Sequence, residues 1–343
     1  MVVAKKFVLR RAFQGEPKLS DMNLVEENLG TLHIGEILIE AEYLSVDPYM
    51  QPFSVHLPVG ATMVGLQIAK IIESKHSRWP VNRRVIAFVG WRTHTIINPD
   101  QSHGFGMIKH DTYFLPPGME NLPPSLALGM LGLTGNAAFF GFTEICEPKY
   151  GETLVVSSAA GAVGSHVAQI AKILGLKVIG IAGTEEKCKW LREELALDHV
   201  INHKIEDLPK ALRKAAPNGI DCYFDTVGGE ISSQVIHQMK EKGRVSVCGS
   251  TSCYGKGDIW RHDILPKSTV LQPAVIFRSL KVEGFFVTRW GHRWSEGIEK
   301  NLAWIREDKL KYKETVIDGF ENTFKAFINL MQGKSIGKTI VKV

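Results

Sequence analysis

The stretch TLVVSSAAGAVGSHVAQIAKILG, residues 153–175, decides the fold, because a β-branched run leads through a glycine-containing turn into a helical pattern. In the dinucleotide fingerprint G-x-G-x-x-G, the second glycine lets the backbone approach a pyrophosphate and the third lets helix and strand pack closely. Gly161 and Gly164 stand at those two positions, and Ala159 stands at the first, where only a tight turn is needed. We predict a phosphate-binding turn with phosphates over the amino end of a helix that starts near Gly164.

The sequence around this turn alternates between strand and helix patterns. Strand patterns cover residues 153–158, 177–182, 199–202, 220–227 and 243–249, and helical patterns cover residues 165–174, 185–195, 205–216 and 232–240. This alternation predicts βαβ units and a parallel sheet. A lone glycine pattern can also be a tight turn without a ligand, but the surrounding alternation favours a dinucleotide site.

The first half of the chain is β-rich. Short apolar or alternating runs at residues 7–13, 36–46, 63–74 and 83–97 are separated by Gly, Pro and Asn, as in a barrel-like domain. Residues 311–343 contain one amphipathic helix and a final strand. A chain of 343 residues is expected to form two domains. We predict a substrate and catalytic domain of residues 1–127 and 314–343, and a nucleotide-binding domain of residues 128–313.

The composition argues against several classes of protein. The net charge is only +5, and no block of Lys and Arg is interleaved with aromatic residues, so a nucleic-acid surface is not indicated. Residues 121–143 carry no charge, but their prolines and glycines suit a packed helix and turn better than a membrane span. The five cysteines form no C-x-x-C pair, and there is no secretion signal, which predicts reduced thiols in a cytoplasmic protein.

The second strand of the alternating region indicates which dinucleotide binds. An NAD site would place Asp or Glu at its end to hold the ribose hydroxyls. Here the strand is followed by Gly183 and Thr184, and Glu185 and Glu186 fall in the first turn of a helix that Thr184 caps. Lys187 can reach a 2′-phosphate, although a solvated helix lysine is the alternative. The missing acid and the available cation together predict NADP(H).

The sequence also lacks the Cys and His ligands with which zinc alcohol dehydrogenases hold their catalytic metal. No cysteine precedes Cys146, and Gly65-Leu66-Gln67 stands where a Gly-His-Glu motif would be sought. The histidines of this half have no recurring ligand spacing; they stand at 33, 56, 76, 94, 103 and 110. We predict no metal site, and alcohol oxidation is poorly supported without a Lewis acid.

Five motifs of the chain are together similar to those of one known family. They are LSVDPYM (44–50), LALGMLGLTG (126–135), SSAAGAVGS (157–165), DCYFDTVGGE (221–230) and IGKTIVKV (336–343). Together they resemble the prostaglandin reductases, or leukotriene 12-hydroxydehydrogenases, which are zinc-independent medium-chain dehydrogenase/reductases. The predicted fold class is therefore α/β, a Rossmann-type doubly wound parallel sheet plus a β-rich GroES-like barrel domain. The resemblance implies NADPH-dependent reduction of the carbon–carbon double bond of enones and enals by a homodimer.

The resemblance also assigns site residues. Those matching the family's cofactor contacts are Gly161, Ala162, Val163 and Gly164 in the pyrophosphate loop, Lys187 at the 2′-phosphate, Cys248 and Gly249 after the fifth strand, and Phe285, Phe286 and Val287 beside the nicotinamide. Tyr49 and Tyr254 match tyrosines that line the substrate cleft, with Tyr254 also a cofactor contact.

Several positions depart from the family's pattern. His203 replaces the adenosine-side tyrosine and can still stack or donate to phosphate, and Ser335 replaces an Asn near the C-terminus; both are expected cofactor contacts. Thr226 and Ala137 replace an Asn and a Thr. Phe277 replaces a tyrosine proposed to hydrogen-bond the substrate carbonyl, which bears on the substrate more than on the reaction type.

The implied chemistry needs little from the protein besides positioning. Hydride transfer to the β-carbon leaves negative charge on the carbonyl oxygen, which requires a hydrogen-bond donor. The cofactor ribose, Tyr254 or Tyr49 can donate, although an aromatic wall is the alternative for each tyrosine. Substrates of the 15-oxoprostaglandin or alkenal type are expected. Quinone reduction is the alternative enzyme activity, and a non-catalytic crystallin-like or RNA-associated role is the alternative of another class.

Overall fold

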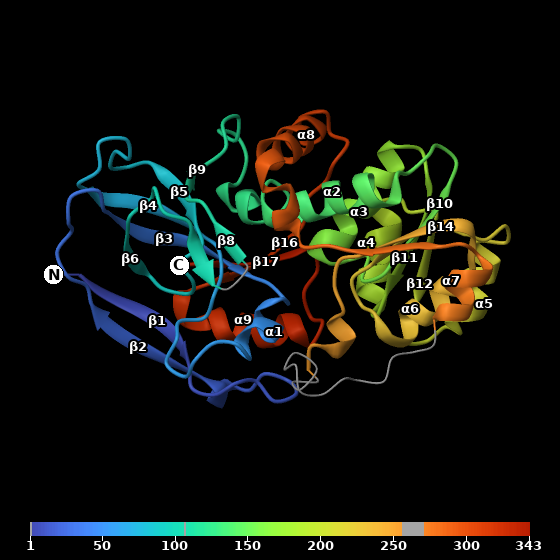
Figure 1. Ribbon diagram of the computed structural model, residues 1–343, viewed down its shortest axis with the longest axis horizontal. Helices are drawn as coiled ribbons and strands as arrows, with labels where there is room; N and C mark the ends of the chain where they lie inside the picture. Colours follow the sequence, from blue (N-terminus) through green and yellow to red (C-terminus); the bar gives the residue numbers. More distant parts are fainter. Residues whose placement is uncertain (1, 106–107, 256–270) are drawn as a thin grey trace. The chain divides into compact units, whose positions relative to one another are not determined.

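The computed structural model describes residues 2–105, 108–255 and 271–343, whose course is drawn in Figure 1. The chain divides into two compact units, which are described separately. The first unit contains the residues up to Gly129, Tyr254 and Gly255, and Glu314–Val343. The second contains Met130–Cys253 and residues 271–313.

The second unit is built on a six-stranded parallel sheet. In spatial order its strands are β12 (His199–Asn202), β11 (Lys177–Ala182), β10 (Thr153–Val156), β13 (Ile220–Asp225), β14 (Met239–Val247) and β15 (Lys281–Gly284). In chain order this is 3-2-1-4-5-6, the arrangement of the dinucleotide-binding Rossmann fold. The predicted doubly wound parallel sheet is confirmed.

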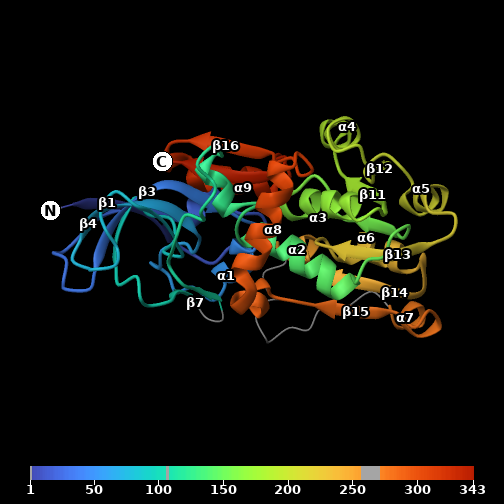
Figure 2. The same ribbon diagram turned by 90° about the horizontal axis from the view of Figure 1, so that it is seen from above.

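Helices cover both faces of this sheet. One face packs against α2 (Leu133–Cys146), α3 (Ala162–Ile173), α4 (Glu185–Glu193) and α8 (Trp294–Arg306), with α2 beside both α3 and α8 (Figure 2). The other face packs against α5 (Leu208–Ala215), α6 (Gly229–Ile236) and α7 (Gln272–Phe277). Leu154 and Val156 of β10 join the first core, and Val155 joins the second. Successive strand side chains point to opposite faces, so an unbroken apolar run indicates a strand that is covered on both sides.

The observed elements differ from the predicted ones mainly at their ends. Helix α3 begins at Ala162, with Gly161 at its N-cap, rather than near Gly164. The helix predicted over residues 232–240 is wrong in its last turn, because α6 ends at Ile236 and β14 begins at Met239. Met239 is fully buried and pairs with Ile220 of β13, so sheet pairing outweighs the helical pattern there.

The first unit is β-rich, as predicted. Its main sheet has the order β16 (Glu314–Asp318), β17 (Lys338–Lys342), β3 (Ile37–Val46), β4 (Gln67–Ser74), β5 (Arg84–Ala87) and β9 (Tyr113–Phe114), and β6 (His94–Ile97) also pairs with β3. Two antiparallel pairs join β1 (Val3–Leu9) to β2 (Met22–Asn28) and β7 (His103–Phe105) to β8 (Ile108–His110). The helices are α1 (Met50–Ser54) and α9 (Thr323–Met331). Short 3-10 helices among the described residues of both units are η1 (Leu19–Asp21), η2 (Pro124–Leu128), η3 (Thr251–Cys253), η5 (Val287–Arg293) and η6 (Phe320–Asn322).

The structure adds detail to two predicted regions of the first unit. The run at residues 83–97 contains two strands, β5 and β6. Gly90 lies between them with φ of +83°, which interrupts the extended backbone, and a Cβ there would stand 2.4 Å from the Met63 oxygen, so the position requires glycine. In the tail, α9 and β17 are found as predicted, and β16 is an additional strand.

The uncharged residues 121–143 form η2 and most of α2, a packed helix and turn. Phe140 and Phe142 of α2 are fully buried in the second unit. Among the helices that the structure describes, none has the length and apolar character needed to cross a membrane.

Candidate active site

The predicted cofactor residues of the second unit lie at one edge of its sheet. Gly161 follows β10, and Lys187 and His203 follow β11 and β12. Cys248 follows β14, and Phe285 follows β15. Because the strands are parallel, their carboxyl ends meet at this edge, and the strand order reverses at β10. Ligands of open α/β sheets bind in the crevice at such a point.

The turn after β10 has room for a ligand at Gly161 but no spare room at Gly164. A Cβ at Gly164 would lie 2.4 Å from the Ser158 oxygen and 3.0 Å from the Ala159 Cα, so close packing of α3 requires this glycine. A Cβ at Gly161 would lie 3.2 Å from the Ser158 oxygen, and a shift of a few tenths of an ångström would relieve this contact. The φ of Gly161, −82°, is one that any residue can adopt. A ligand close to the backbone would therefore explain Gly161 better than the local fold does.

The adenosine side of the site gathers cationic side chains around Gly183. Thr184 caps α4 by accepting the N–H of Lys187 at 3.4 Å. His203 donates its backbone N–H to the end of β11 at 3.1 Å, which holds the turn after β12 beside that strand. Burial, and after it the charge of Lys204, lower the pKa of Lys187. Sequence reasoning missed Lys204, for which the available signal was its position next to His203.

The ends of β13 and β14 are tied together on the nicotinamide side. Cys248 and Gly249 donate their N–H groups to the Asp225 carbonyl oxygen at 2.8 and 3.2 Å. The buried Asp225 carboxylate accepts the N–H groups of Val227 and Gly228 at 3.0 and 2.9 Å. Burial, with a smaller contribution from Asp225, raises the pKa of the Cys248 thiol to about 12, so this thiol keeps its proton.

The phenylalanines after β15 have different environments. Phe285 is a core side chain, since its ring lies 5.3 Å from that of Trp290 and a Cβ at Gly141 would stand 2.2 Å from it. A cofactor contact by Phe285 would have to use its main chain. Phe286 is 56% exposed. Phe277 ends α7, before the opposite, amino end of β15, and is 86% exposed, so it is not grouped with the nicotinamide-side residues of its own chain.

Three further positions singled out in the sequence are also in the second unit. Val287 begins η5 and is half-buried. Ala137 is buried in the first half of α2. The Thr226 hydroxyl donates to the Ser157 oxygen at 3.1 Å, which joins the ends of β13 and β10.

In the first unit, the predicted residue Tyr49 has a buried hydroxyl without a hydrogen-bond partner among the described residues. The residue directly precedes α1, and its ring packs edge-on against that of Phe53 at 5.7 Å. Burial, and after it the charge of Asp47, raise the pKa of Tyr49 well above its ordinary value, so the hydroxyl keeps its proton. Buried donors without acceptors are costly, and such a donor is typical of a ligand site.

A buried ion pair fixes the turn that carries Tyr49. Lys338 Nζ lies 3.1 Å from Asp47 Oδ1, and the two side chains are only 5% and 7% exposed. Lys338 also donates to the backbone oxygens of Val46 and Thr339 at 3.0 Å each, so its ammonium is fully satisfied. The pair ties β17 to the end of β3. Sequence reasoning missed it, because nothing local relates positions so far apart in the chain.

The other predicted contacts of the first unit are Tyr254 and Ser335. Tyr254 is 9% exposed and follows η3, and Ser335 is 8% exposed between α9 and β17. The first unit thus contains Tyr49, Tyr254 and Ser335, and the second contains all the other predicted site residues.

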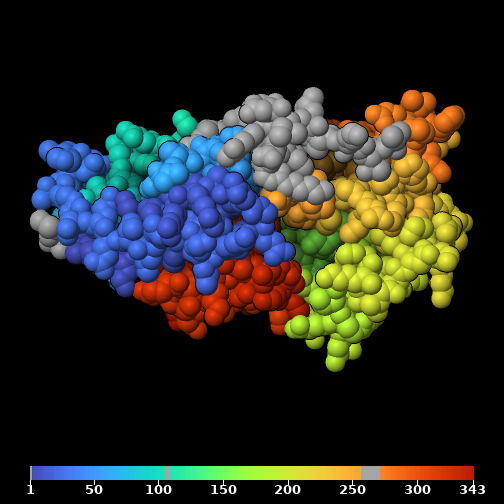
Figure 3. All heavy atoms as spheres, turned by 90° about the horizontal axis from the view of Figure 1, so that it is seen from below, coloured from blue at the N-terminus to red at the C-terminus, as the bar shows by residue number. Residues whose placement is uncertain are grey.

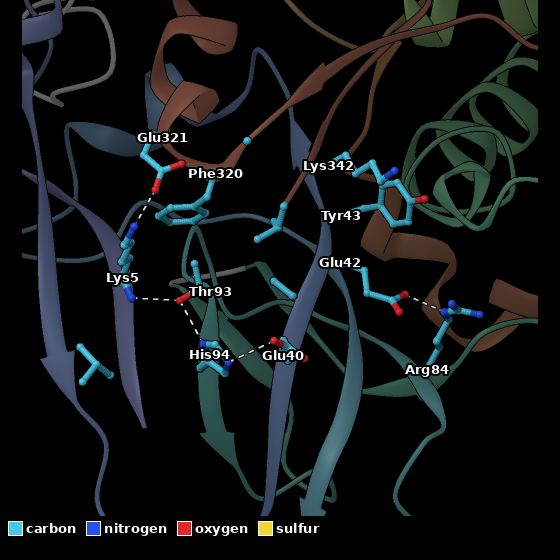
Figure 4. A pocket seen from close by; sticks show the side chains of 14 residues that line it. Lys5, Glu40, Glu42, Tyr43, Arg84, Thr93, His94, Phe320, Glu321 and Lys342 are labelled. Atoms are coloured by element: carbon cyan, nitrogen blue, oxygen red, sulfur yellow. Dashed lines mark hydrogen bonds and ion pairs between the residues drawn. The ribbon is translucent and has the colours of Figure 1, made fainter. Parts of the chain in front are cut away.

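A groove of about 720 Å³ in the first unit has none of the predicted site residues in its lining (Figure 4). Six of its charged or titratable side chains form pairs: Lys5 with Glu321 at 2.7 Å, Arg84 with Glu42 at 2.6 Å and His94 with Glu40 at 3.5 Å. We assign this groove no role in the site.

The residues at the sheet edge fit a phosphorylated dinucleotide. The first turn of α3 has N–H groups without helical acceptors, and Gly161 leaves space beside them for a pyrophosphate. Lys187 and Lys204 supply positive charge after β11 and β12. No acid stands at the end of β11 to hold the ribose hydroxyls of an unphosphorylated cofactor. This donor set suits NADPH.

Comparison with known proteins agrees with this geometry. A family model described as the N-terminal domain of oxidoreductase matches residues 5–104, and one described as zinc-binding dehydrogenase matches residues 162–304. Within the described part of the chain, no group of three or more His, Cys, Asp or Glu is placed to hold a metal ion.

Individual proteins match along their full length. Prostaglandin reductase 1 of Bos taurus is 44% identical over 345 residues, 100% of each chain. The 2-alkenal reductase (NADP(+)-dependent) of Nicotiana tabacum is 34% identical over 99% of this chain and 97% of its own. CurA from Vibrio vulnificus, solved in complex with NADPH, has a TM-score of 0.88 at 32% identity over 99% of both chains. The chain belongs to the prostaglandin reductase subfamily of the zinc-independent medium-chain dehydrogenase/reductases.

Proposed function

We propose that this chain catalyses the NADPH-dependent reduction of the carbon–carbon double bond of α,β-unsaturated ketones and aldehydes. The observation that carries the proposal is the buried, protonated and unpartnered hydroxyl of Tyr49 among the described residues of a chain related to enone and alkenal reductases. Residues 128–313 serve as the nucleotide-binding domain, and residues 1–127 with 314–343 serve as the substrate domain.

NADPH, when bound, supplies the hydride that is added to the β-carbon. The residues proposed to hold it are Gly161, Ala162, Val163 and Gly164 for the pyrophosphate, Lys187 and His203 for the adenosine end, and Cys248, Gly249, Phe285, Phe286 and Val287 for the nicotinamide. Tyr254 and Ser335 are further proposed cofactor contacts. Backbone N–H groups at the start of α3 would bind the pyrophosphate, because they have no acceptors within the helix.

Tyr49 and Tyr254 act on the substrate oxygen. As the β-carbon receives hydride, negative charge develops on the carbonyl oxygen, and a fixed donor there lowers the barrier. Burial and the charge of Asp47 both disfavour the phenolate of Tyr49. Tyr49 therefore donates a hydrogen bond and retains its proton, while water protonates the α-carbon.

The test uses NADPH deuterated at the transferred position, with 2-nonenal as the substrate. The label should appear on the β-carbon of the saturated aldehyde. Label on the carbinol carbon of an allylic alcohol would contradict the proposal, because it would show carbonyl reduction. Rapid NADPH oxidation with a quinone but not with nonenal would identify a quinone reductase, and no oxidation with either would favour a non-catalytic role.

We also propose that the protein is a homodimer formed through the outer edge of β15. This strand ends the order of the sheet, and the exposed apolar side chains near it are Ile276, Phe277, Val282 and Phe286, at 72%, 86%, 43% and 56%. An apolar edge strand is a template for pairing with a second copy. Light scattering should give twice the mass of the chain, and Val282→Lys should give the monomer. A monomeric parent protein would contradict this proposal.

The cytoplasm is the proposed compartment. Cys146, Cys188 and Cys222 are buried free thiols, which a reducing environment preserves. Cell fractionation should recover the protein with cytoplasmic enzymes, and recovery with a secreted or membrane fraction would contradict this. The proposed partners are small-molecule enones and enals, and neither a nucleic acid nor a membrane.

A further inference from the structure

Cationic side chains from two elements converge on Gly183, at the carboxyl end of β11. A Cβ at this glycine would lie 3.1 Å from Nε2 of His203 and 3.4 Å from Cε of Lys204. Lys187, from the first turn of α4, is close enough to Lys204 for that charge to lower its pKa, after the larger effect of burial. Gly183 has no side chain to cover Nε2 of His203 and Cε of Lys204, and Lys187 follows in the first turn of α4.

The backbone holds these groups in place without a ligand. His203 donates its N–H to the Ala182 oxygen at 3.1 Å, and Lys204 donates its N–H to the Asn202 side chain at 3.2 Å. In the described part of the chain, no carboxylate forms an ion pair with the Lys204 ammonium. The positive charges of Lys187 and Lys204 repel each other, so an anion beside both would be favoured.

The three side chains near Gly183 are accessible from solution. Lys204 is exposed, and Lys187 and His203 are half-buried. The segment that carries them, residues 185–215, is yellow-green in Figure 3 and reaches the surface on that face. A phosphate group can therefore reach these side chains from solution.

Carboxylates face His203 from other elements. Together with His203 they line a cavity of about 470 Å³, and they are Glu206 and Asp207 before and at the cap of α5 and Glu230 of α6. The first turn of α4 adds Glu185 and Glu186, of which Glu185 pairs with Arg192. His203 thus stands between a cavity lined by carboxylates and the ammonium of Lys204, and both affect the charge of its ring.

We propose that Lys187, His203 and Lys204 together bind the 2′-phosphate of NADPH, and that His203 takes up a proton when it does so. The inference rests on the proposed use of NADPH and adds a second lysine and a pH dependence to it. A phosphate monoester brings nearly two negative charges and three acceptor oxygens. These match three donors around a position that has no side chain.

The direction in which NADP⁺ affinity changes with pH follows from the linkage between ligand binding and proton binding. In the free protein, burial and after it the charge of Lys204 lower the pKa of His203, so the ring is neutral near pH 7. A phosphate dianion beside the ring favours the imidazolium and raises this pKa again. The complex then holds more protons than the free protein, so affinity for NADP⁺ rises as the pH falls from about 8 towards 6. Affinity for NAD⁺ has no such dependence.

The role of Lys204 is tested by calorimetric titration with NADP⁺, NAD⁺ and 2′,5′-ADP. Lys204→Gln should weaken NADP⁺ and 2′,5′-ADP by about ten- to a hundredfold, the range for a hydrogen bond to a charged group, and leave NAD⁺ unchanged. Lys189→Gln is the matched control, because it removes an exposed lysine of α4 that lies near Glu193. Equal effects of the two substitutions on NADP⁺ would overturn the assignment of Lys204.

Proton uptake is measured by repeating the NADP⁺ titration at pH 7.5 in buffers of different ionisation enthalpy. The parent protein should take up a fraction of a proton more than His203→Gln, which keeps a neutral donor. The 2′-phosphate itself titrates near pH 6, but it does so with both proteins and cancels in the difference. Identical proton numbers for the two proteins would overturn the role of His203.

Two further comparisons distinguish this inference from a site for free phosphate and from the proposed enone reduction. Orthophosphate should bind far more weakly than 2′,5′-ADP, whereas similar affinities would identify a site for free phosphate and contradict the proposal. The experiments follow binding alone, so they can succeed if no enone is reduced. Conversely, enone reduction with unaltered NADP⁺ binding in Lys204→Gln and His203→Gln would leave the proposed function standing without this inference.

Discussion

The phosphate turn of the second unit and the tyrosine site of the first unit are built in opposite ways. At the turn after β10, the important feature is a lack of side chains, since Gly164 admits the helix and Gly161 leaves space for a ligand. At the tyrosine site, the important features are side chains, since a nearly buried Lys338 pairs with Asp47 just before Tyr49.

This difference has consequences for stability and for ligand binding. A glycine turn uses backbone donors that folding leaves unsatisfied in any case, so it adds little to the cost of folding. A buried ion pair requires that both charges leave water, and each depends on the other. Substitutions in the two places should therefore differ in the change in free energy of unfolding that they cause and in the ligand whose binding they affect.

The largest effect is expected for Lys338→Met. Removal of one partner leaves the Asp47 carboxylate buried without a cation, which costs about 3–5 kcal/mol. Urea unfolding should show this loss, while the affinity of the second unit for NADP⁺ changes little. Adding Asp47→Asn to Lys338→Met should recover part of the stability, and a double variant as unstable as the sum of the single variants would show that the two side chains do not form a coupled pair.

The second prediction tests whether a buried ionisable group of the second unit also affects the free energy of unfolding. His166 of α3 is fully buried, and Asn301 accepts from its Nε2 at 3.2 Å while donating its own amide to the Met130 oxygen. Burial lowers the pKa of His166 to about 4. Between about pH 6.5 and 4 the unfolded chain binds a proton that the folded protein does not, so stability falls with pH by about 3 kcal/mol in total.

The measurement is the free energy of unfolding at pH 7, 6 and 5 for the parent protein and for His166→Gln. The glutamine keeps a donor for Asn301 and does not titrate, so its stability should fall less steeply below pH 6.5. His110, whose pKa burial also lowers to about 4, is present in both proteins and cancels in the comparison. Parallel pH profiles would show that His166 is protonated to the same extent in the folded and unfolded chains.

The third prediction separates the two glycines of the turn. Gly164→Ala should cost about 1–3 kcal/mol, because its Cβ would meet the Ser158 oxygen at 2.4 Å and α3 must shift. Gly161→Ala should change stability by less than about 1 kcal/mol, yet weaken NADP⁺, because its Cβ enters the space for the pyrophosphate. Equal destabilisation by the two substitutions, or unchanged NADP⁺ binding in Gly161→Ala, would contradict the distinction.

The same contrast explains what could be predicted from sequence. The parallel sheet, its order of elements and the positions of Gly161 and Gly164 follow from local patterns, because each strand, turn and helix is encoded within about thirty residues. The cap at Thr184, and with it the place of Lys187 in the first turn of α4, is equally local.

Features that depend on distant residues could not be predicted. Lys204 faces Lys187 only because two strands lie side by side, and Asp47 meets Lys338 only because the last strand returns to β3. Met239 begins a strand because Ile220 pairs with it, although its own neighbours continue a helical pattern. In each case a tertiary contact decides the outcome, and no pattern within the segment encodes that contact.

The smallest change in stability is expected for Tyr49→Phe, which should nevertheless lower turnover. Its hydroxyl has no partner among the described residues, so its removal leaves no protein group unsatisfied, and the free energy of unfolding should change by less than about 1 kcal/mol. Loss of a donor to the developing oxyanion should lower kcat with 2-nonenal by about a hundredfold, with NADP⁺ affinity unaltered. Tyr43→Phe is the control, since it removes a hydroxyl from the groove of Figure 4 in the same unit and should leave kcat unchanged. Full turnover in Tyr49→Phe would mean that the ring serves only as a wall, and the donor would then have to be Tyr254 or the cofactor ribose.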